Sequence, residues 1–179
     1  MKKQIADLEF EPMITAQQIE ERVKAIGAQI SEDFKDTVPV LVGVLNGSFL
    51  FIADLIKKVS IPCEINFTKL ASYYGGTTST LKIREDIDLT VDIKGRDVLI
   101  IEDIVDTGNT AHYLIEKLKE RGPASLKMCS LLLKPAALQK KIEELKYVGF
   151  EIENEFVVGY GLDYKEMGRN LADIYKKVG

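Results

Sequence analysis

The sequence is poor in the side chains that bind soft metal ions, since its 179 residues include only two cysteines and one histidine. Cys63 and Cys129 lack the spacing of metal ligands and lie in apolar, strand-like stretches, so we expect two buried thiols. His112 falls in a predicted helix and has no cysteine or second histidine near it in sequence. A metal site built from imidazole and thiolate is therefore not expected.

Excess positive charge and long apolar runs are also lacking. Lys and Arg number 24 against 28 Asp and Glu, a formal net charge of −4 that argues against an electrostatically driven nucleic-acid binder. No run approaches the roughly 18 apolar residues of a membrane span, and the basic start over residues 1–7 has no apolar stretch behind it. We expect no membrane partner, no signal peptide and a location in the reducing cytoplasm.

Composition and periodicity predict one α/β domain over residues 1–179. Apolar residues make up 46% of the chain and charged residues 29%, as in soluble globular proteins. Thr15 and Gln18 fit a capping box before a helix, and Ser48 is expected to cap the next one. We predict helices over about 15–33, 49–58, 110–121 and 135–145, and strands over about 38–45, 63–67, 81–88, 97–102, 126–133 and 156–158. This alternation predicts a central, mainly parallel sheet flanked by helices.

The stretch from Val98 to Thr110 is the most informative part of the chain. It begins as a buried parallel strand and runs straight into two adjacent carboxylates, Glu102 and Asp103, at the end where open sheets bind ligands. Asp106 and a Thr-Gly-x-Thr turn follow, and the turn offers backbone N–H groups and hydroxyls that suit a phosphate. Carboxylates beside a phosphate site suit ribose hydroxyls or Mg²⁺. The alternative is a turn whose acids only cap a helix.

This arrangement resembles the phosphoribosyl-diphosphate motif of the type I phosphoribosyltransferases. Similar segments occur in the order that the family has them, at 45–48, 69–73, 102–110, 130–134 and 156–164. The last one resembles the branch that converts hypoxanthine and guanine to IMP and GMP in purine salvage. The resemblance implies the type I phosphoribosyltransferase fold, with a small hood over the base from about 150–179 and the N-terminal segment. It also implies Mg²⁺ as cofactor, and phosphoribosyl diphosphate and a 6-oxopurine as substrates.

The resemblance gives Asp106 the catalytic role, in which its carboxylate removes, or accepts a hydrogen bond from, the proton on purine N7. Glu102 and Asp103 would contact the ribose hydroxyls and one Mg²⁺ through water. The residues that follow Asp106 would hold the 5-phosphate: Thr107, Gly108, Asn109 and Thr110. Some relatives carry a basic residue in place of Asn109, so here the backbone and the helix dipole would neutralise the phosphate.

For the purine, the resemblance makes Lys134 the donor to O6, a contact that the 6-amino group of adenine would not accept. Phe156 would stack on the purine face and Val157 would meet the base edge through its backbone. Asp163 would lie near that edge and ligate a second Mg²⁺. Without the resemblance, Lys134 would be interpreted as a solvent-facing lysine and Phe156 as a core residue.

Pyrophosphate would be bound by Asn46, Gly47 and Arg169. Many relatives have lysine in place of Asn46, so the resemblance implies a backbone contact at this turn. Ser72 and Tyr73 match the closing loop of the family, here a mobile loop over about 72–80. A plain hairpin loop is the alternative to this lid.

Two other functions remain open from the sequence. A regulator on the same fold would bind DNA or RNA, which the acidic composition disfavours. An enzyme that prefers xanthine would differ at purine C2, where contacts from backbone groups leave little trace in the sequence. The resemblance also implies a homodimer or homotetramer.

Overall fold

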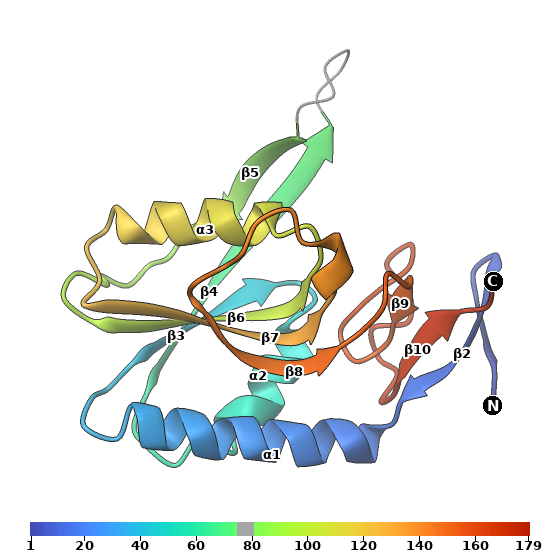
Figure 1. The fold of residues 1–179 in the computed structure, drawn as a ribbon, viewed down its shortest axis with the longest axis horizontal. Coiled ribbons are helices and arrows are strands. Elements are labelled where there is room, and N and C mark those ends of the chain that lie inside the picture. The colour runs from blue at the N-terminus through green and yellow to red at the C-terminus, as the bar shows by residue number, and fades with distance from the viewer. Residues whose placement is uncertain (75–80) are drawn as a thin grey trace.

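The computed structural model describes the backbone of residues 1–74 and 81–179, and the side chains of these residues apart from 71–74 and 81–85. Its larger sheet has six strands in the order β5-β4-β3-β6-β7-β8, and all neighbours run parallel except β4 and β5 (Figure 1). The prediction of an α/β fold with a mainly parallel sheet is confirmed. The strands are β3 (Val40–Leu45), β4 (Glu64–Tyr74), β5 (Leu81–Ile87), β6 (Asp97–Val105), β7 (Ser125–Leu133) and β8 (Leu145–Glu151).

Helices cover both faces of this sheet. Helix α3 (Asn109–Lys119) lies on one face, and α1 (Ala16–Asp33) and α2 (Phe49–Ile56) lie on the other (Figure 1). The capping box that opens α1 is confirmed, because the Thr15 N–H donates to Gln18 Oε1 at 2.9 Å and the Gln18 N–H donates to Thr15 Oγ1 at 3.3 Å. None of the described helices has the length and apolar composition that a bilayer crossing requires.

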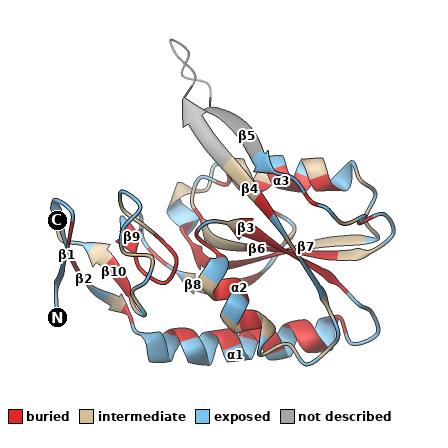
Figure 2. Cartoon of the chain, turned by 180° about the vertical axis from the view of Figure 1, so that it is seen from behind, coloured by how far each residue is buried: buried red, intermediate tan, exposed pale blue. Residues whose placement is uncertain are grey.

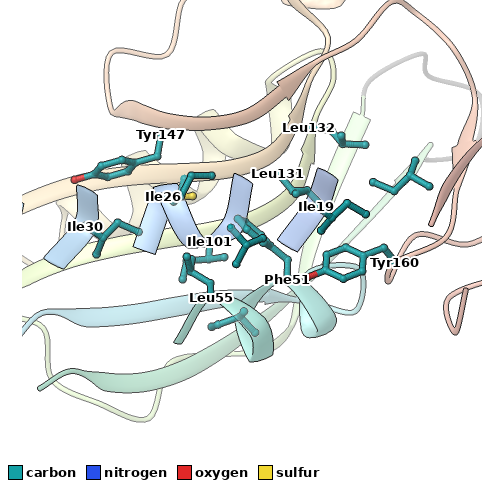
Figure 3. Close-up of a cluster of buried hydrophobic side chains, with 14 of the residues drawn as sticks. Ile19, Ile26, Ile30, Phe51, Leu55, Ile101, Leu131, Leu132, Tyr147 and Tyr160 are labelled. Carbon is teal, nitrogen blue, oxygen red and sulfur yellow. The ribbon is translucent and has the colours of Figure 1, made fainter. Parts of the chain in front are cut away.

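The core forms two layers, one on each face of the parallel strands (Figure 2). Alternation along each strand divides the side chains between them: in β6, Leu99 and Ile101 join the layer under α1 and α2, whereas Val98 and Ile100 join the layer under α3. The first layer is shown in Figure 3, where apolar side chains of α1 and α2 meet those of β6 and β7. Burial on both faces explains why these strands read as continuous apolar runs.

A second, four-stranded sheet joins the two ends of the chain in the order β1-β2-β10-β9 (Figure 1). Its core contains Phe10 and Val158, and Ile14 pairs with Ile174 across β2 and β10. Strands β1, β2, β8 and β10 were not predicted from the sequence, whereas the short strand near 156–158 was. The strands are β1 (Lys3–Ile5), β2 (Leu8–Ile14), β9 (Val157–Val158) and β10 (Ile174–Lys177).

Two local predictions were wrong. Ser48 precedes α2, but its hydroxyl donates to the Val44 carbonyl at 2.5 Å and makes no capping bond. The helix predicted over 135–145 is only a 3₁₀ turn at Pro135–Ala137, followed by irregular chain that leads into β8. The physical reason is tertiary, because the Gln139 N–H donates to the Thr107 carbonyl at 3.1 Å instead of to a helical partner.

The two cysteines are free thiols in the structure. Cys129 is buried in β7, and burial raises the pKa of its thiol far above the usual range. Cys63 is half-buried and its pKa is raised for the same reason, so the expectation of full burial holds only for Cys129. His112 lies in α3 as expected, and its Nε2 is buried with no hydrogen-bond partner among the described residues.

Candidate active site

The site lies at the carboxyl ends of β3 and β6, the two central strands of the larger sheet. The chain leaves β3 for β4 and β5 at one side of the sheet and then returns to β6 on the other side of β3. A reversal of this kind leaves a crevice beyond the two strand ends, where open α/β sheets bind ligands. The turn at 46–48 and the residues at 102–110 meet there.

The end of β6 and the start of α3 enclose a cavity of about 160 Å³. Its lining includes every residue predicted for the ribose and the 5-phosphate except Asn109, namely Glu102, Asp103, Asp106, Thr107, Gly108 and Thr110. The backbone N–H of Asn109 donates to Thr107 Oγ1 at 3.4 Å. The predicted motif therefore surrounds one hollow, which its order in the sequence alone did not guarantee.

The turn that opens α3 depends on Gly108. Its φ of 84° lies in the left-handed region that suits glycine. Helix α3 begins at the next residue, and the first N–H groups of a helix have no partner within it. These amides and the helix dipole favour an anion, with no basic side chain needed in the turn itself.

Glu102 and Asp103 form a partly buried acidic pair at the end of β6. Burial raises the pKa of Glu102 well above its usual value, and the charge of Asp103 raises it further. Burial also raises the pKa of Asp103, although a hydrogen bond with Glu102 and the charge of Arg169 act in the opposite direction. A cation beside this pair would favour its fully ionised form.

Two glycines let three segments of the site approach closely. A Cβ at Gly47 would overlap the carboxylate of Asp103, and a Cβ at Gly161 would overlap the carbonyl oxygen of Gly47. The Leu45–Asn46 peptide just before this turn is cis. The turn predicted to bind pyrophosphate is thus packed between the acidic pair and the loop that follows β9.

The carboxylates of the site fit Mg²⁺ better than they fit a metal caged by protein alone. The described part of the chain holds no cluster of three or more Asp, Glu, His or Cys suited to a metal ion. Mg²⁺ keeps several waters and is often held by one or two carboxylates together with substrate oxygens, which Glu102 and Asp103 can supply. Asp163, the other predicted ligand, forms an ion pair with Arg169 instead.

Lys134 and Asp106 contact each other across two neighbouring strand ends. Lys134 Nζ donates to Asp106 Oδ2 at 3.0 Å, and its own N–H donates to the Val105 carbonyl at 2.9 Å. The Lys134 side chain is only 9% exposed, against 46% for Asp106. Lys134 is therefore not a solvent-facing residue, and its charge is balanced by a carboxylate of the predicted motif.

Three contacts hold Arg169 beside the turn at Gly47. Its guanidinium is 2.7 Å from Asp163 Oδ1 and 3.1 Å from Glu166 Oε2, and its Nη1 donates to the Gly161 carbonyl at 2.9 Å. Because Gly161 packs on Gly47, the residues predicted to bind pyrophosphate lie on neighbouring segments.

Phe156 is 45% exposed and so is not a core residue. Its ring meets Tyr164 edge-on with a centroid distance of 5.6 Å and lies 6.2 Å from the ring of Phe10. Val157 is buried in β9. Phe10 was not predicted to lie near the site, although alternating apolar residues over 8–14 were a signal of its strand.

The predicted lid can be followed only in part. Ser72 and Tyr73 lie in β4, where their backbone pairs with Ile83 and Lys82 of β5. Their side chains, and residues 75–80, lie outside the described part of the structure. The lid therefore stays a prediction.

Comparisons with known proteins agree with this geometry. The family model of the phosphoribosyl transferase domain matches residues 13–165. The chain is 47% identical over 162 residues to the hypoxanthine-guanine phosphoribosyltransferase of Streptococcus pneumoniae strain R6. This match covers 90% of this chain and 89% of the relative. It is 44% identical over 170 residues to the hypoxanthine phosphoribosyltransferase of Salmonella typhimurium, a match that covers 94% of this chain and 95% of the relative.

Solved structures show the same similarity in three dimensions. The hypoxanthine phosphoribosyltransferase of Staphylococcus aureus superposes with a TM-score of 0.88 at 43% identity, covering 94% of this chain and 91% of that one. A hypoxanthine-guanine phosphoribosyltransferase of Bacillus anthracis gives a TM-score of 0.86 at 37% identity, covering 94% and 97%. The chain belongs to the phosphoribosyl transferase family, in the group of the hypoxanthine-guanine phosphoribosyltransferases.

Proposed function

We propose that this protein transfers the 5-phosphoribosyl group of phosphoribosyl diphosphate to N9 of hypoxanthine or guanine, a reaction of purine salvage. The contact of Lys134 with Asp106 beside the phosphate cavity is the observation that supports this best. Purine O6 and N7 are neighbours on one edge of the base. An ammonium donor next to a carboxylate acceptor matches the 6-oxo group and the N7–H of such a purine.

In this reaction the bond from C1′ to the diphosphate breaks, the bond from N9 to C1′ forms, and the proton on N7 leaves the base. The carboxylate of Asp106 would remove or hydrogen-bond that proton and stabilise the positive charge that develops in the purine. The ammonium of Lys134 would donate to O6, and it would meet a donor rather than an acceptor in adenine. Phe156 would stack on the base, a contact worth about 1–3 kcal/mol, and Val157 would meet its edge through the backbone.

The sugar phosphate would bind along the cavity at the end of β6. Its 5-phosphate would accept hydrogen bonds from the first N–H groups of α3 and from the hydroxyls of Thr107 and Thr110. The ribose hydroxyls would donate to Glu102 and Asp103. This orientation would direct C1′ away from the helix, toward Asp106 and the base.

Glu102 and Asp103 would hold one Mg²⁺, directly or through water, and Asp163 a second. When bound, Mg²⁺ neutralises negative charge on the leaving pyrophosphate. The guanidinium of Arg169 would bind pyrophosphate with its fork of donors, in exchange for part of its pairing with acids of its own loop. The backbone at Asn46 and Gly47 would complete this end of the site.

The surroundings of the site suit the same function. The four-stranded sheet and its loops would form the hood over the base, and residues 72–80, with Ser72 and Tyr73, would close over the substrate. Closure would shield the cationic transition state from water.

A homodimer or homotetramer is the assembly we propose. Phe49, Ile65 and Phe67 are each more than a third exposed and line an apolar groove of about 510 Å³ beside α2 and β4, which suits a second copy. The cytoplasm is the compartment we propose, where free thiols stay reduced.

Pyrophosphate release tests the proposal. Phosphoribosyl diphosphate and Mg²⁺ would be incubated with hypoxanthine, guanine, xanthine, adenine or uracil in parallel. We expect turnover with hypoxanthine or guanine and none with adenine or uracil. Turnover confined to xanthine would reassign the base, and no turnover with any base would exclude the enzyme and direct attention to a nucleic-acid partner.

A further inference from the structure

A hydrogen bond between Tyr160 and Asp54 joins two segments of the site from outside the substrate cavity. The Tyr160 hydroxyl donates to Asp54 Oδ2 at 2.7 Å, and Tyr160 is buried. Asp54 lies on α2, whereas Tyr160 lies in the loop after β9. Both residues line a separate cavity of about 480 Å³ between α1, α2 and residues 170–172, so neither faces the cavity at the phosphate turn.

The backbone around Tyr160 has little freedom to move. Its N–H donates to the Leu171 carbonyl at 2.8 Å, and the N–H of Gly161 donates to the Arg169 carbonyl at 2.9 Å. Gly159 and Gly161 on either side have φ of 106° and 99°, which side chains rarely allow. The Tyr160 side chain belongs to the same buried core cluster as Phe51 (Figure 3), so both the backbone and the ring of this residue are held in place.

Gly161, the residue after Tyr160, connects the ring to the segments predicted to bind pyrophosphate. Gly161 is in close contact with the carbonyl of Gly47, and its own carbonyl accepts the hydrogen bond from Arg169 Nη1. The turn at Gly47 leads directly into α2, the helix that carries Asp54. The Tyr160–Asp54 bond thus completes a closed network of contacts between α2, the turn before it and the segment that carries Arg169.

The partners suit a permanent bond. Burial and the hydrogen bond to Asp54 raise the pKa of Tyr160 beyond its usual range, so its hydroxyl stays a donor. Burial acts to raise the pKa of Asp54, but hydrogen bonds from Lys57 and Tyr160 outweigh it and lower that pKa, so the carboxylate stays an acceptor. The other carboxylate oxygen of Asp54 accepts a hydrogen bond from Lys57 Nζ at 2.6 Å.

We propose that the Tyr160–Asp54 hydrogen bond is a positioning device, which holds Gly161, the turn at Gly47 and the Arg169 guanidinium in place to bind pyrophosphate and phosphoribosyl diphosphate. Neither residue touches substrate. The inference rests on the proposed function. It identifies Tyr160 and Asp54, two residues outside the substrate cavity, as contributors to the binding of the diphosphate. Lys134 and Phe156, which we assign to the purine, lie outside this network of contacts. Loss of the hydrogen bond should therefore affect the binding of phosphoribosyl diphosphate more than that of the purine.

The test compares Tyr160→Phe with Tyr147→Phe. Tyr147 is also buried, donates to Asp33 Oδ2 at 2.6 Å, and lies at the opposite end of the same core cluster (Figure 3). Both variants lose one phenol–carboxylate hydrogen bond, so they carry a similar structural loss. We expect Tyr160→Phe to raise the KM for phosphoribosyl diphosphate about three- to tenfold and to change the KM for hypoxanthine less than about twofold, with both constants unchanged in Tyr147→Phe.

Asp54→Ala, which removes the acceptor, should reproduce this selective rise. The double variant should add little to it, because both changes break the same bond. The inference is overturned if Tyr160→Phe leaves the KM for phosphoribosyl diphosphate unchanged, or if Tyr147→Phe raises it equally. Calorimetric titration of pyrophosphate with Mg²⁺ into each protein needs no turnover. Weaker pyrophosphate binding by Tyr160→Phe than by wild type would support the positioning role even if the proposed reaction failed with every base.

Discussion

Lys134 and Asp106, the two side chains that we assign to the purine edge, are bonded to each other at 3.0 Å. They come from the ends of β7 and β6, which pair in parallel, so the sheet itself sets their spacing. Their surroundings differ, because Lys134 is buried while Asp106 is nearly half exposed. Loss of Asp106 would leave the buried Lys134 cation without its carboxylate partner, whereas loss of Lys134 would leave a carboxylate that water can still reach. Substitutions at the two positions should therefore separate catalysis from purine binding.

Asp106→Asn keeps the size of the side chain and an oxygen for Lys134, but it cannot take the N7 proton. We expect kcat to fall by about 10²–10⁴ while the dissociation constant for phosphoribosyl diphosphate stays close to that of wild type. Steady-state kinetics and equilibrium titration measure the two quantities. Asp97→Asn, at the amino end of the same strand where Asp97 accepts from Ser125, is the matched control and should leave kcat unchanged. An unchanged kcat in Asp106→Asn would remove Asp106 from the mechanism.

Lys134→Gln removes the charged donor that we assign to O6. We expect the KM for hypoxanthine to rise by about ten- to a hundredfold, the range of a hydrogen bond to a charged group, with little change for phosphoribosyl diphosphate. Lys127→Gln, near the other end of β7 and stacked over Phe34, is the control for loss of a lysine from this strand. Equal losses for both substrates in Lys134→Gln would indicate a damaged fold instead of a lost purine contact.

The parts of the fold with a local signal could be predicted from the sequence. Helix α1 follows from its capping box and its apolar stripe, both of which lie within one stretch of chain. The same is true of the motif at 102–110, because strand, acids, turn and helix follow one another directly. The structure adds that these residues line one cavity.

Contacts between distant segments could not be predicted in this way. The pairing of β2 with β10, which includes Ile14 and Ile174, builds the second sheet. Nothing in the sequence of either strand indicates which distant strand it pairs with. The helix predicted over 135–145 failed for a related reason, since Leu138 and Ile142 pack under α3 while the backbone of this segment bonds to the phosphate turn. Tertiary contacts there outweigh a local preference for helix.

Gly47→Ala tests the close approach of the pyrophosphate turn to the acidic pair. The added Cβ overlaps the carboxylate of Asp103, the movable end of a side chain, so the carboxylate should shift while the fold survives. We expect the KM for phosphoribosyl diphosphate to rise at least about tenfold, equivalent to about 1.4 kcal/mol of lost binding. Kinetics over a range of Mg²⁺ concentrations measure this change, together with a thermal melt.

Gly149→Ala is the matched control for Gly47→Ala. Its Cβ overlaps the Leu131 carbonyl between β8 and β7, where the backbone cannot move aside. We expect the opposite balance of effects, with a lower melting temperature and an unchanged KM. A Gly47→Ala protein that loses stability but binds phosphoribosyl diphosphate normally would show that the turn and Asp103 are not coupled in function.

Asp54→Asn should change the acid stability of the protein. The pKa of Asp54 is lowered from 3.8 in the folded protein, because hydrogen bonds from Lys57 and Tyr160 outweigh the effect of burial. A carboxyl whose pKa is lower when folded stabilises the fold above its unfolded pKa, and this contribution is lost as the pH falls through the folded pKa. The side chain is 41% exposed, so solvent screening keeps the contribution within roughly 1 kcal/mol.

Urea unfolding at pH 7, 5, 4 and 3 would measure this contribution. We expect wild type to be more stable than Asp54→Asn at pH 7 and 5, and the difference in unfolding free energy to shrink below pH 3.8 as the wild-type carboxyl becomes protonated. Asp36→Asn, at an exposed turn position with no hydrogen bond or ion pair from the described residues, should differ little from wild type at any of these pH values. A difference between wild type and Asp54→Asn that stays constant down to pH 3 would mean that the carboxylate charge contributes nothing. The effect of the substitution would then come from packing alone, and the pairing of Asp54 with Tyr160 would not depend on charge.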